Sequence, residues 1–209
     1  MRHSTILGDG YHWAVSTKSG ARARARQAMR TEVASVVANL ILERGYDETT
    51  VEDICTAAEI SRSTFFRYFP SKEDALFADT ADAGDKLLIS LTARPSDETP
   101  WAAMRHALEP LIDHYTATDD RSRRLARLIV HNPVLAARHR EKSARWHTML
   151  RPEMARRLHA DPNDDSDPRA DAVIAAALGC VEAALLAWTT TDQPHTLSAL
   201  LDTAMNAVR

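Results

Sequence analysis

The sequence has few of the features that mark secreted or membrane proteins. Its two cysteines, Cys55 and Cys180, lie far apart in apolar periodic segments and outside any CxxC or Cys/His cluster. This pattern predicts buried free thiols in a reducing compartment. No run approaches the roughly 18 apolar residues that a spanning helix needs, and the first residues lack the apolar region of a signal peptide. We therefore expect a cytoplasmic protein with no membrane partner.

Motifs for catalysis and metal binding are also missing. The sequence contains no GxSxG and no glycine-rich phosphate loop after a strand. His131, His139 and His147 recur at intervals of eight residues, which on a helix means about 12 Å of rise and about 80° of rotation, too far for neighbouring ligands of one zinc ion. We expect no enzyme activity, no metal site and no cofactor.

The pattern of apolar residues is helical along the chain of 209 residues, and no alternating strand pattern occurs. Proline-containing polar breaks at 93–100 and 161–168 separate the later helices. We predict an all-α protein of about nine helices, with a small helix-turn-helix head and a larger helical body. The expected division is a flexible N-terminal tail over 1–20, a DNA-binding domain over 21–70, and a linker helix with a ligand-binding and dimerisation domain over 71–209.

Two short helices and then a longer one are predicted after a first helix over 26–44. The segment "TVED", residues 50–53, matches a capping box, and Ser61 can cap the next helix, "RSTFFRYF". Pro70 ends that helix, and Ser71 begins another that runs to residue 92. Two short helices joined by a tight link are typical of a helix-turn-helix motif.

The stretch "ISRSTFFRYF" crowds aromatic and basic residues onto the second of these helices. Phe65 and Phe69 are four residues apart, so they share a face and can form a small core with Ile60, Ile54 and Val37. The outward positions are Arg62, Ser63, Phe66 and Arg67. The aromatic residues therefore divide into two groups, since Phe65 and Phe69 pack while Tyr68 and Phe66 meet DNA in the major groove.

The net charge is only −3, but basic residues without any acid occupy 18–31 and 60–72. Arg67 can reach guanine edges or phosphate, and Lys72 can reach backbone phosphate. Within "ARARAR", Arg22, Arg24 and Arg26 would enter the flanking minor groove or follow the phosphates, as basic arms do. The alternative is that each basic cluster is an ordinary solvated helix face.

Residues 45–77, "GYDETTVEDICTAAEISRSTFFRYFPSKEDALF", resemble the DNA-binding head of the TetR family of bacterial transcriptional regulators. The resemblance extends over roughly residues 25–78. It implies a homodimer that binds a palindromic operator in double-stranded DNA and acts as a repressor, which a small molecule in the body releases.

By this resemblance Thr50 caps the second helix and touches phosphate, and Lys72 holds the DNA backbone. The residues that it places facing DNA are Ser61, Arg62, Ser63, Thr64, Arg67 and Tyr68. Two positions depart from the family pattern. Glu59 stands where the turn usually has glycine and must adopt a left-handed conformation, at about 1 kcal/mol. Phe66 stands where tyrosine is common, so one phosphate-binding hydroxyl is lost.

The body carries aromatic residues and methionines that suit an apolar ligand. The candidate lining residues are Trp101, Met104, Leu108, Tyr115, Leu128, Trp146, Met149, Leu150 and Trp188. Ordinary core packing is the alternative. A basic strip over 121–145, which includes Arg138 and Arg145, weakly resembles TetR-type regulators thought to sense acyl-coenzyme A, whose phosphates such a strip would suit.

Small residues in "AAALGCVEAALLAW", residues 175–188, permit close helix approach, and with residues 197–208 they can form a dimeric four-helix bundle or pack within one chain. Two other functions stay open from the residues alone. One is a helical enzyme, or a ligand- or cofactor-binding protein, whose head is incidental, and the other is a nucleoid-type DNA binder without an effector.

Overall fold

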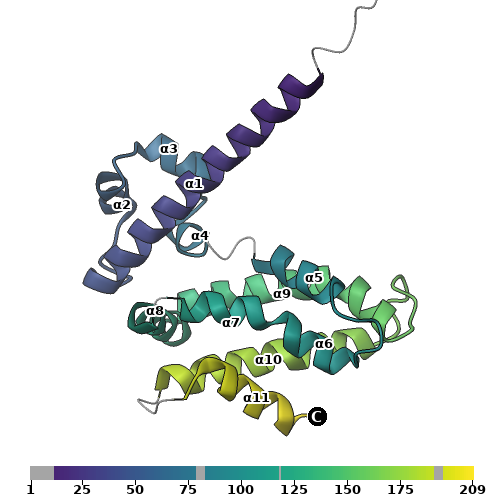
Figure 1. Ribbon diagram of the computed structural model, residues 1–209. Helices are drawn as coiled ribbons and strands as arrows, with labels where there is room; N and C mark the ends of the chain where they lie inside the picture. The colour runs from purple at the N-terminus through teal and green to yellow at the C-terminus, as the bar shows by residue number, and fades with distance from the viewer. Residues whose placement is uncertain (1–11, 79–82, 118, 191–194) are drawn as a thin grey trace, which may run out of the picture. The chain divides into compact units, whose positions relative to one another are not determined.

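The structure is a computed structural model that describes residues 12–78, 83–117, 119–190 and 195–209, with side chains from residue 20 onward except that of Asp119. Over these ranges the chain is helical and contains no strand, which confirms the all-α class (Figure 1). The chain divides into two compact units, Met1–Asp79 and Thr80–Arg209. We call their described parts the head and the body.

The head holds the first helices, which are α1 (His12–Arg44), α2 (Val51–Ala57), α3 (Arg62–Tyr68) and α4 (Lys72–Leu76). α1 begins well before the predicted start at Arg26 and includes residues 12–20 of the expected tail, while residues 1–11 lie outside the described ranges. The Ala and Arg residues over 21–26 are strong helix formers, so they continue the helix toward its N-terminus.

Side-chain caps set the starts of the short helices, as predicted. Thr50 and Asp53 form a reciprocal capping box, with the Asp53 amide 3.2 Å from Thr50 Oγ1 and the Thr50 amide 3.0 Å from Asp53 Oδ2. Ser61 accepts from the Thr64 amide at 3.1 Å, and Ser71 accepts from the Asp74 amide at 3.1 Å. Such caps satisfy amides that have no partner inside the helix, so they fix where α2, α3 and α4 begin.

Phe65 and Phe69 form the centre of the head, with ring centroids 5.4 Å apart and both side chains fully buried. Ile54 of α2 and Val37 of α1 are also fully buried, as predicted, whereas Ile60 in the turn is only half-buried. Between α2 and α3 the turn places Glu59 at φ 53°, the left-handed conformation expected there. This turn joins α2 to α3, and the buried side chain of Phe65 packs α3 into the core of the head.

The body contains seven helices in its described residues, which are α5 (Ala83–Thr92), α6 (Pro100–Ala107), α7 (Glu109–Thr116), α8 (Asp119–His131), α9 (Pro133–Arg157), α10 (Arg169–Thr190) and α11 (Leu197–Ala207). The total exceeds the predicted nine because two expected helices are each divided. Residues 72–92 form α4 and α5, and the expected helix that begins at Trp101 forms α6 and α7. The second break lies at Leu108, because Pro110 has no amide to continue the ladder.

α10 packs against α8, α9 and α11 and contributes more buried residues than any other described helix of the body. By length and composition alone it could cross a membrane, but half of its most apolar window is buried inside the body, as in a core helix. Its other side is exposed, and Leu186 retains 47% of its accessible surface there.

The linker helix α5 lies very close to α9. A Cβ atom at Gly84 would lie 2.5 Å from Trp146 Cδ1, which only glycine avoids. Trp146 belongs to α9 and is buried in the body core. Gly84 therefore allows α5 to pack directly against the Trp146 indole ring.

Candidate functional site

The outward face of α3 carries the predicted DNA-reading side chains. Arg62, Ser63, Phe66 and Arg67 are exposed, as is Ser61 at the cap, whereas Thr64 and Tyr68 are half-buried. Their orientation follows from the opposite face, because Phe65 and Phe69 are fixed in the core. The structure thus gathers hydroxyl, guanidinium and aromatic groups on one side of a helix held by its own buried face.

Two contacts organise the start of α3. Arg62 forms an ion pair with Glu52 of α2, and its guanidinium lies 5.7 Å from the centroid of the Phe66 ring. The side chain of Arg62 is still 62% exposed. The ion pair therefore draws the cation toward α2. Phe66, a predicted DNA contact, also supports the guanidinium by a cation–π contact.

The end of α3 is held by Arg30, which was not among the predicted site residues. Its guanidinium donates to the Tyr68 carbonyl at 2.9 Å and lies 5.1 Å from the Phe69 centroid. A cation at this position satisfies a carbonyl that the helix leaves unpaired. Beside it, Arg67 lies 5.3 Å from the Tyr68 centroid and stays exposed. Arg30 thus positions α3, and Arg67 is presented outward.

Lys72 is engaged inside the head. Its Nζ atom donates to the carbonyls of Tyr46 at 2.7 Å and Thr49 at 3.0 Å, and it lies 3.9 Å from the Tyr46 ring centroid. These contacts join the start of α4 to the loop between α1 and α2. A phosphate contact by Lys72 stays a prediction, but the described contacts give this cation a structural role that the sequence did not suggest.

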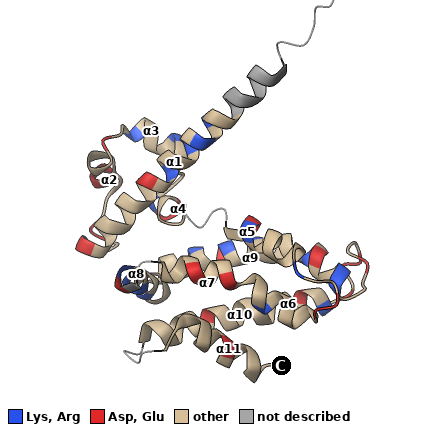
Figure 2. Ribbon diagram, in the orientation of Figure 1, with Lys and Arg blue, Asp and Glu red and all other residues tan. Residues whose placement is uncertain are grey.

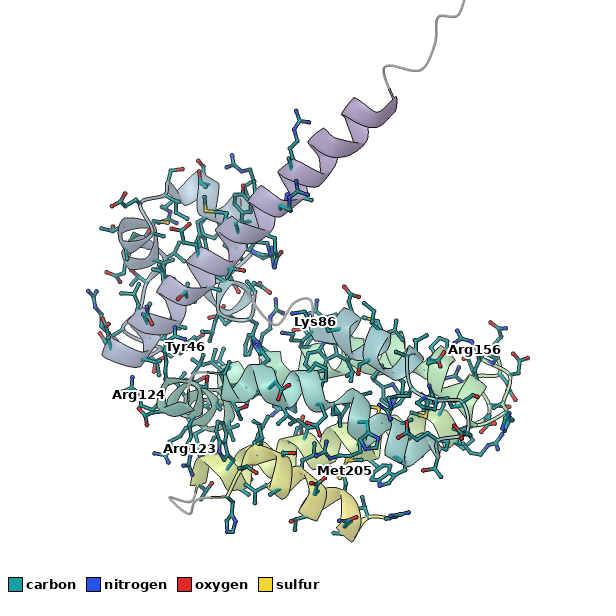
Figure 3. All side chains as sticks on the ribbon, viewed as in Figure 1. Tyr46, Lys86, Arg123, Arg124, Arg156 and Met205 are labelled. Carbon is teal, nitrogen blue, oxygen red and sulfur yellow. The ribbon has the colours of Figure 1, made fainter. Side chains whose placement is uncertain are left out.

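A second contact joins the same two segments. Tyr46 (labelled in Figure 3) donates its hydroxyl hydrogen bond to Glu73 Oε1. Burial and the neighbouring Glu73 raise the pKa of Tyr46 above its usual value. Burial alone would raise the pKa of Glu73, but hydrogen bonds from Tyr46 and Ser71 outweigh it and leave that pKa below its usual value. Glu73 is therefore ionised near neutral pH and fastens α4 to Tyr46.

The arginines of "ARARAR" lie on α1 and not on an extended arm. Arg22, Arg24 and Arg26 are all exposed, and Figure 2 shows basic residues along this part of α1. Successive helical residues turn by about 100°, so this spacing of two distributes the three cations around the axis. Alternation of Ala and Arg favours helix, which explains why the expected arm is helical. Their contact with DNA stays a prediction.

The predicted ligand residues of the body are mostly core. Met104, Leu108, Trp146, Leu150 and Trp188 are buried in the body cluster. The partly buried members are Trp101, Tyr115, Leu128, Arg138 and Met149, and Arg145 is exposed. Two cavities lined by described residues have volumes of about 380 and 490 Å³, and of the predicted residues only Trp188 lines either of them.

The basic strip is divided among local partners. Arg123 donates to the Trp188 carbonyl at 2.9 Å and Arg127 to the Thr189 carbonyl at 2.7 Å, so both cap the end of α10 (Arg123 is labelled in Figure 3). Arg138 pairs with Glu141 at 2.5 Å, and Arg145 lies 4.0 Å from the same carboxylate. Arg123, Arg127 and Arg138 are thus engaged by groups of the body, whereas Arg145 is 65% exposed and only at the limit of ion-pair distance.

Comparisons with known proteins agree with this architecture. Residues 36–78 match the family described as "Bacterial regulatory proteins, tetR family", and residues 98–209 match the "MftR C-terminal domain". The HTH-type transcriptional regulator TcmR of Streptomyces glaucescens is 31% identical over 174 residues, which cover 79% of this chain and 77% of TcmR.

Two solved structures share the fold. The SmeT–triclosan complex has a TM-score of 0.58 at 19% identity and covers 86% of this chain and 91% of its own. The repressor FadR of Thermus thermophilus, in complex with lauroyl-CoA, has a TM-score of 0.52 at 22% identity and covers 86% of this chain and 92% of its own.

Proposed function

The chain belongs to the TetR family of bacterial transcriptional regulators, and from this premise we propose that it is a cytoplasmic repressor. It binds a palindromic operator as a homodimer, needs no cofactor and catalyses no reaction. The observation that carries the proposal is the outward face of α3, where Ser63 and Arg67 are exposed while Phe65 is buried on the other face. A helix presented in this way can enter the major groove and read base edges.

Capture of genomic DNA tests this function. Sequencing the fragments that the purified protein retains should reveal an inverted repeat, and binding to that repeat should weaken with salt by a slope of about −0.9 in log K for each phosphate neutralised. Arg67→Ala should abolish retardation of the fragment. The matched control is Arg169→Ala, which removes a body arginine paired with Asp167 and should leave binding unchanged. Binding that is indifferent to salt, or loss of retardation in both variants, would refute the proposed interface.

The exposed side of α10 supports the homodimer. Ala172, Ala175, Ala176 and Ala187 are exposed on a helix whose opposite side forms the body core. Small apolar side chains let two helices approach closely. An exposed apolar patch is also a common mark of a protein–protein interface. In the proposed dimer α10 packs against the same helix of a second copy, with α11 beside it.

Sedimentation equilibrium of wild type and of Ala176→Arg tests the dimer. The new charge should convert the dimer to monomer, because burying an unpaired guanidinium at the interface is unfavourable. Ala144→Arg places the same charge on an exposed site of α9 and should leave the dimer intact. A monomeric wild type, or a dimer that tolerates Ala176→Arg, would contradict this part of the proposal.

The effector in the proposal is a small apolar compound or an acyl-coenzyme A. The two solved relatives were found with triclosan and lauroyl-CoA. Local pairing of Arg138 and Arg145 with Glu141 favours the apolar compound over a polyphosphate ligand. Both compounds should be titrated against the preformed DNA complex. If lauroyl-CoA releases DNA and the Arg138→Ala, Arg145→Ala double variant loses only that response, the acyl-coenzyme A alternative is correct.

A further inference from the structure

The two arginines on the outward face of α3 have different surroundings. Arg62 forms an ion pair with Glu52 of α2, whereas Arg67 forms no ion pair with any residue that the structure describes and lies against the Tyr68 ring. Both arginines are exposed. The start of α3 therefore presents a neutral pair, and its last turn presents a full positive charge.

The ion pair leaves most of the Arg62 guanidinium available to another partner. It joins Glu52 Oε1 to the terminal Nη1 of Arg62, and both side chains remain more than half exposed. A guanidinium has five N–H donors in a planar fork, so one carboxylate oxygen at one terminal nitrogen leaves donors for a second acceptor. The Phe66 ring, whose centroid lies 5.7 Å away, further limits the directions that the guanidinium can take. Arg62 is thus oriented but not buried.

Stability alone gives Glu52 little reason to be an acid. Ion pairs between exposed side chains contribute little to folding. Asp53 already places a carboxylate in the first turn of α2, where negative charge favours the helix. On the side that meets DNA, a further carboxylate repels phosphate and lowers the general attraction of the head for DNA. This cost calls for a role of Glu52 in recognition.

Attraction to phosphate is the same for every DNA sequence, whereas donors aimed at a base edge distinguish one sequence from another. We propose that Glu52 is a specificity-determining residue of the head. Its carboxylate cancels the attraction of Arg62 for phosphate and holds the remaining guanidinium donors toward a base edge. Guanine is the favoured base, because its N7 and O6 accept two hydrogen bonds from one arginine. This inference rests on the proposed function, in which the outward face of α3 enters the major groove.

The test compares Glu52→Gln with wild type on two duplexes of equal length and composition. One carries the inverted repeat recovered from genomic DNA, and the other carries the same bases in shuffled order. Arg62 of the variant is free to contact phosphate, so the shuffled duplex should bind about fivefold more tightly per head at about 0.15 M salt, with a salt slope steeper by about 0.9. Affinity for the repeat should change less, because Arg62 loses its orientation as it gains attraction. The ratio of the two affinities should therefore fall.

Two further proteins separate this role from a general effect of charge. Glu43 is an exposed carboxylate of α1 that forms no ion pair among the described residues, so Glu43→Gln changes the net charge equally and should leave the ratio of affinities unchanged. Arg62→Met should lose discrimination at one base pair of each half-site. When Glu52→Gln is added to Arg62→Met, the ratio should not change again. Circular dichroism checks that every variant is folded.

An unchanged ratio in Glu52→Gln would overturn the inference, as would an equal fall in Glu43→Gln. Equal weakening of all duplexes by Arg62→Met would also overturn it, because Arg62 would then be a phosphate contact. These three outcomes leave recognition of the repeat by wild type intact. A wild type that binds both duplexes equally would instead refute the proposed function, and this inference with it.

Discussion

Replacement of Lys72 by methionine separates the two roles available to this side chain. Methionine keeps most of the aliphatic stem but removes both hydrogen bonds from Nζ, to the Tyr46 and Thr49 carbonyls, and the contact with the Tyr46 ring. Hydrogen bonds that involve a charged group contribute about 1.5–3 kcal/mol, and a partly exposed cation–π contact contributes about 0.5–1 kcal/mol. Because the site is only part-buried, water replaces some of this, and we expect Lys72→Met to destabilise the head by about 2–4 kcal/mol.

Native-state hydrogen exchange of the α2 and α3 amides measures this loss in the head itself. Lys86→Met is the matched control, because Lys86 is an exposed lysine of α5 and its loss should change stability by less than about 0.5 kcal/mol. If Lys72→Met leaves exchange unchanged while it weakens DNA binding and flattens its salt dependence, the cation acts on phosphate and our structural reasoning is wrong.

Four further substitutions separate structural residues from DNA-reading ones. Phe65→Ala should cost about 3–5 kcal/mol and melt the head, whereas Arg67→Ala should keep its circular dichroism and lose only operator binding; equal helix loss would make Arg67 structural. Glu59→Gly should raise the stability of the head by up to about 1 kcal/mol in urea unfolding, because glycine adopts the positive φ of this position without steric strain. A less stable variant would show that Glu59 is not strained. Since the pKa of His139 is about 4 in the fold and about 6.5 when unfolded, the unfolded chain binds more protons between these values. Stability should therefore fall as pH falls from 6.5 to 4, by at most about 3 kcal/mol, and His139→Gln should remove that part of the pH dependence.

Local chemistry explains what could be predicted from the sequence in the head. The caps at Thr50, Ser61 and Ser71 depend on residues three positions apart, and the pairing of Phe65 with Phe69 depends on helical spacing. Such features need no knowledge of distant segments, and the structure confirms all of them.

The contacts that escaped prediction join residues far apart in the chain. Arg30 reaches a carbonyl 38 positions away and Lys72 reaches carbonyls 26 and 23 positions away, so a basic residue in the sequence could equally have been assigned to DNA. In the body, large apolar side chains such as Trp146 have the same spacing whether they fill a core or line a cavity. The cavity of about 380 Å³ could not be predicted, because small residues such as Gly179 line it and small side chains leave no periodic signal in the sequence.

Because α1 is one continuous helix, the positions of its N-terminal arginines around the helix axis are fixed relative to α3. Arg30 is fastened to the last carbonyl of α3, and Arg22, Arg24 and Arg26 follow on the same rod toward the N-terminus. Insertion of one residue between Arg26 and Arg30 would rotate those three cations by about 100° and shift them by about 1.5 Å relative to α3. The head therefore tolerates changes of residue type along this stretch more readily than insertions or deletions.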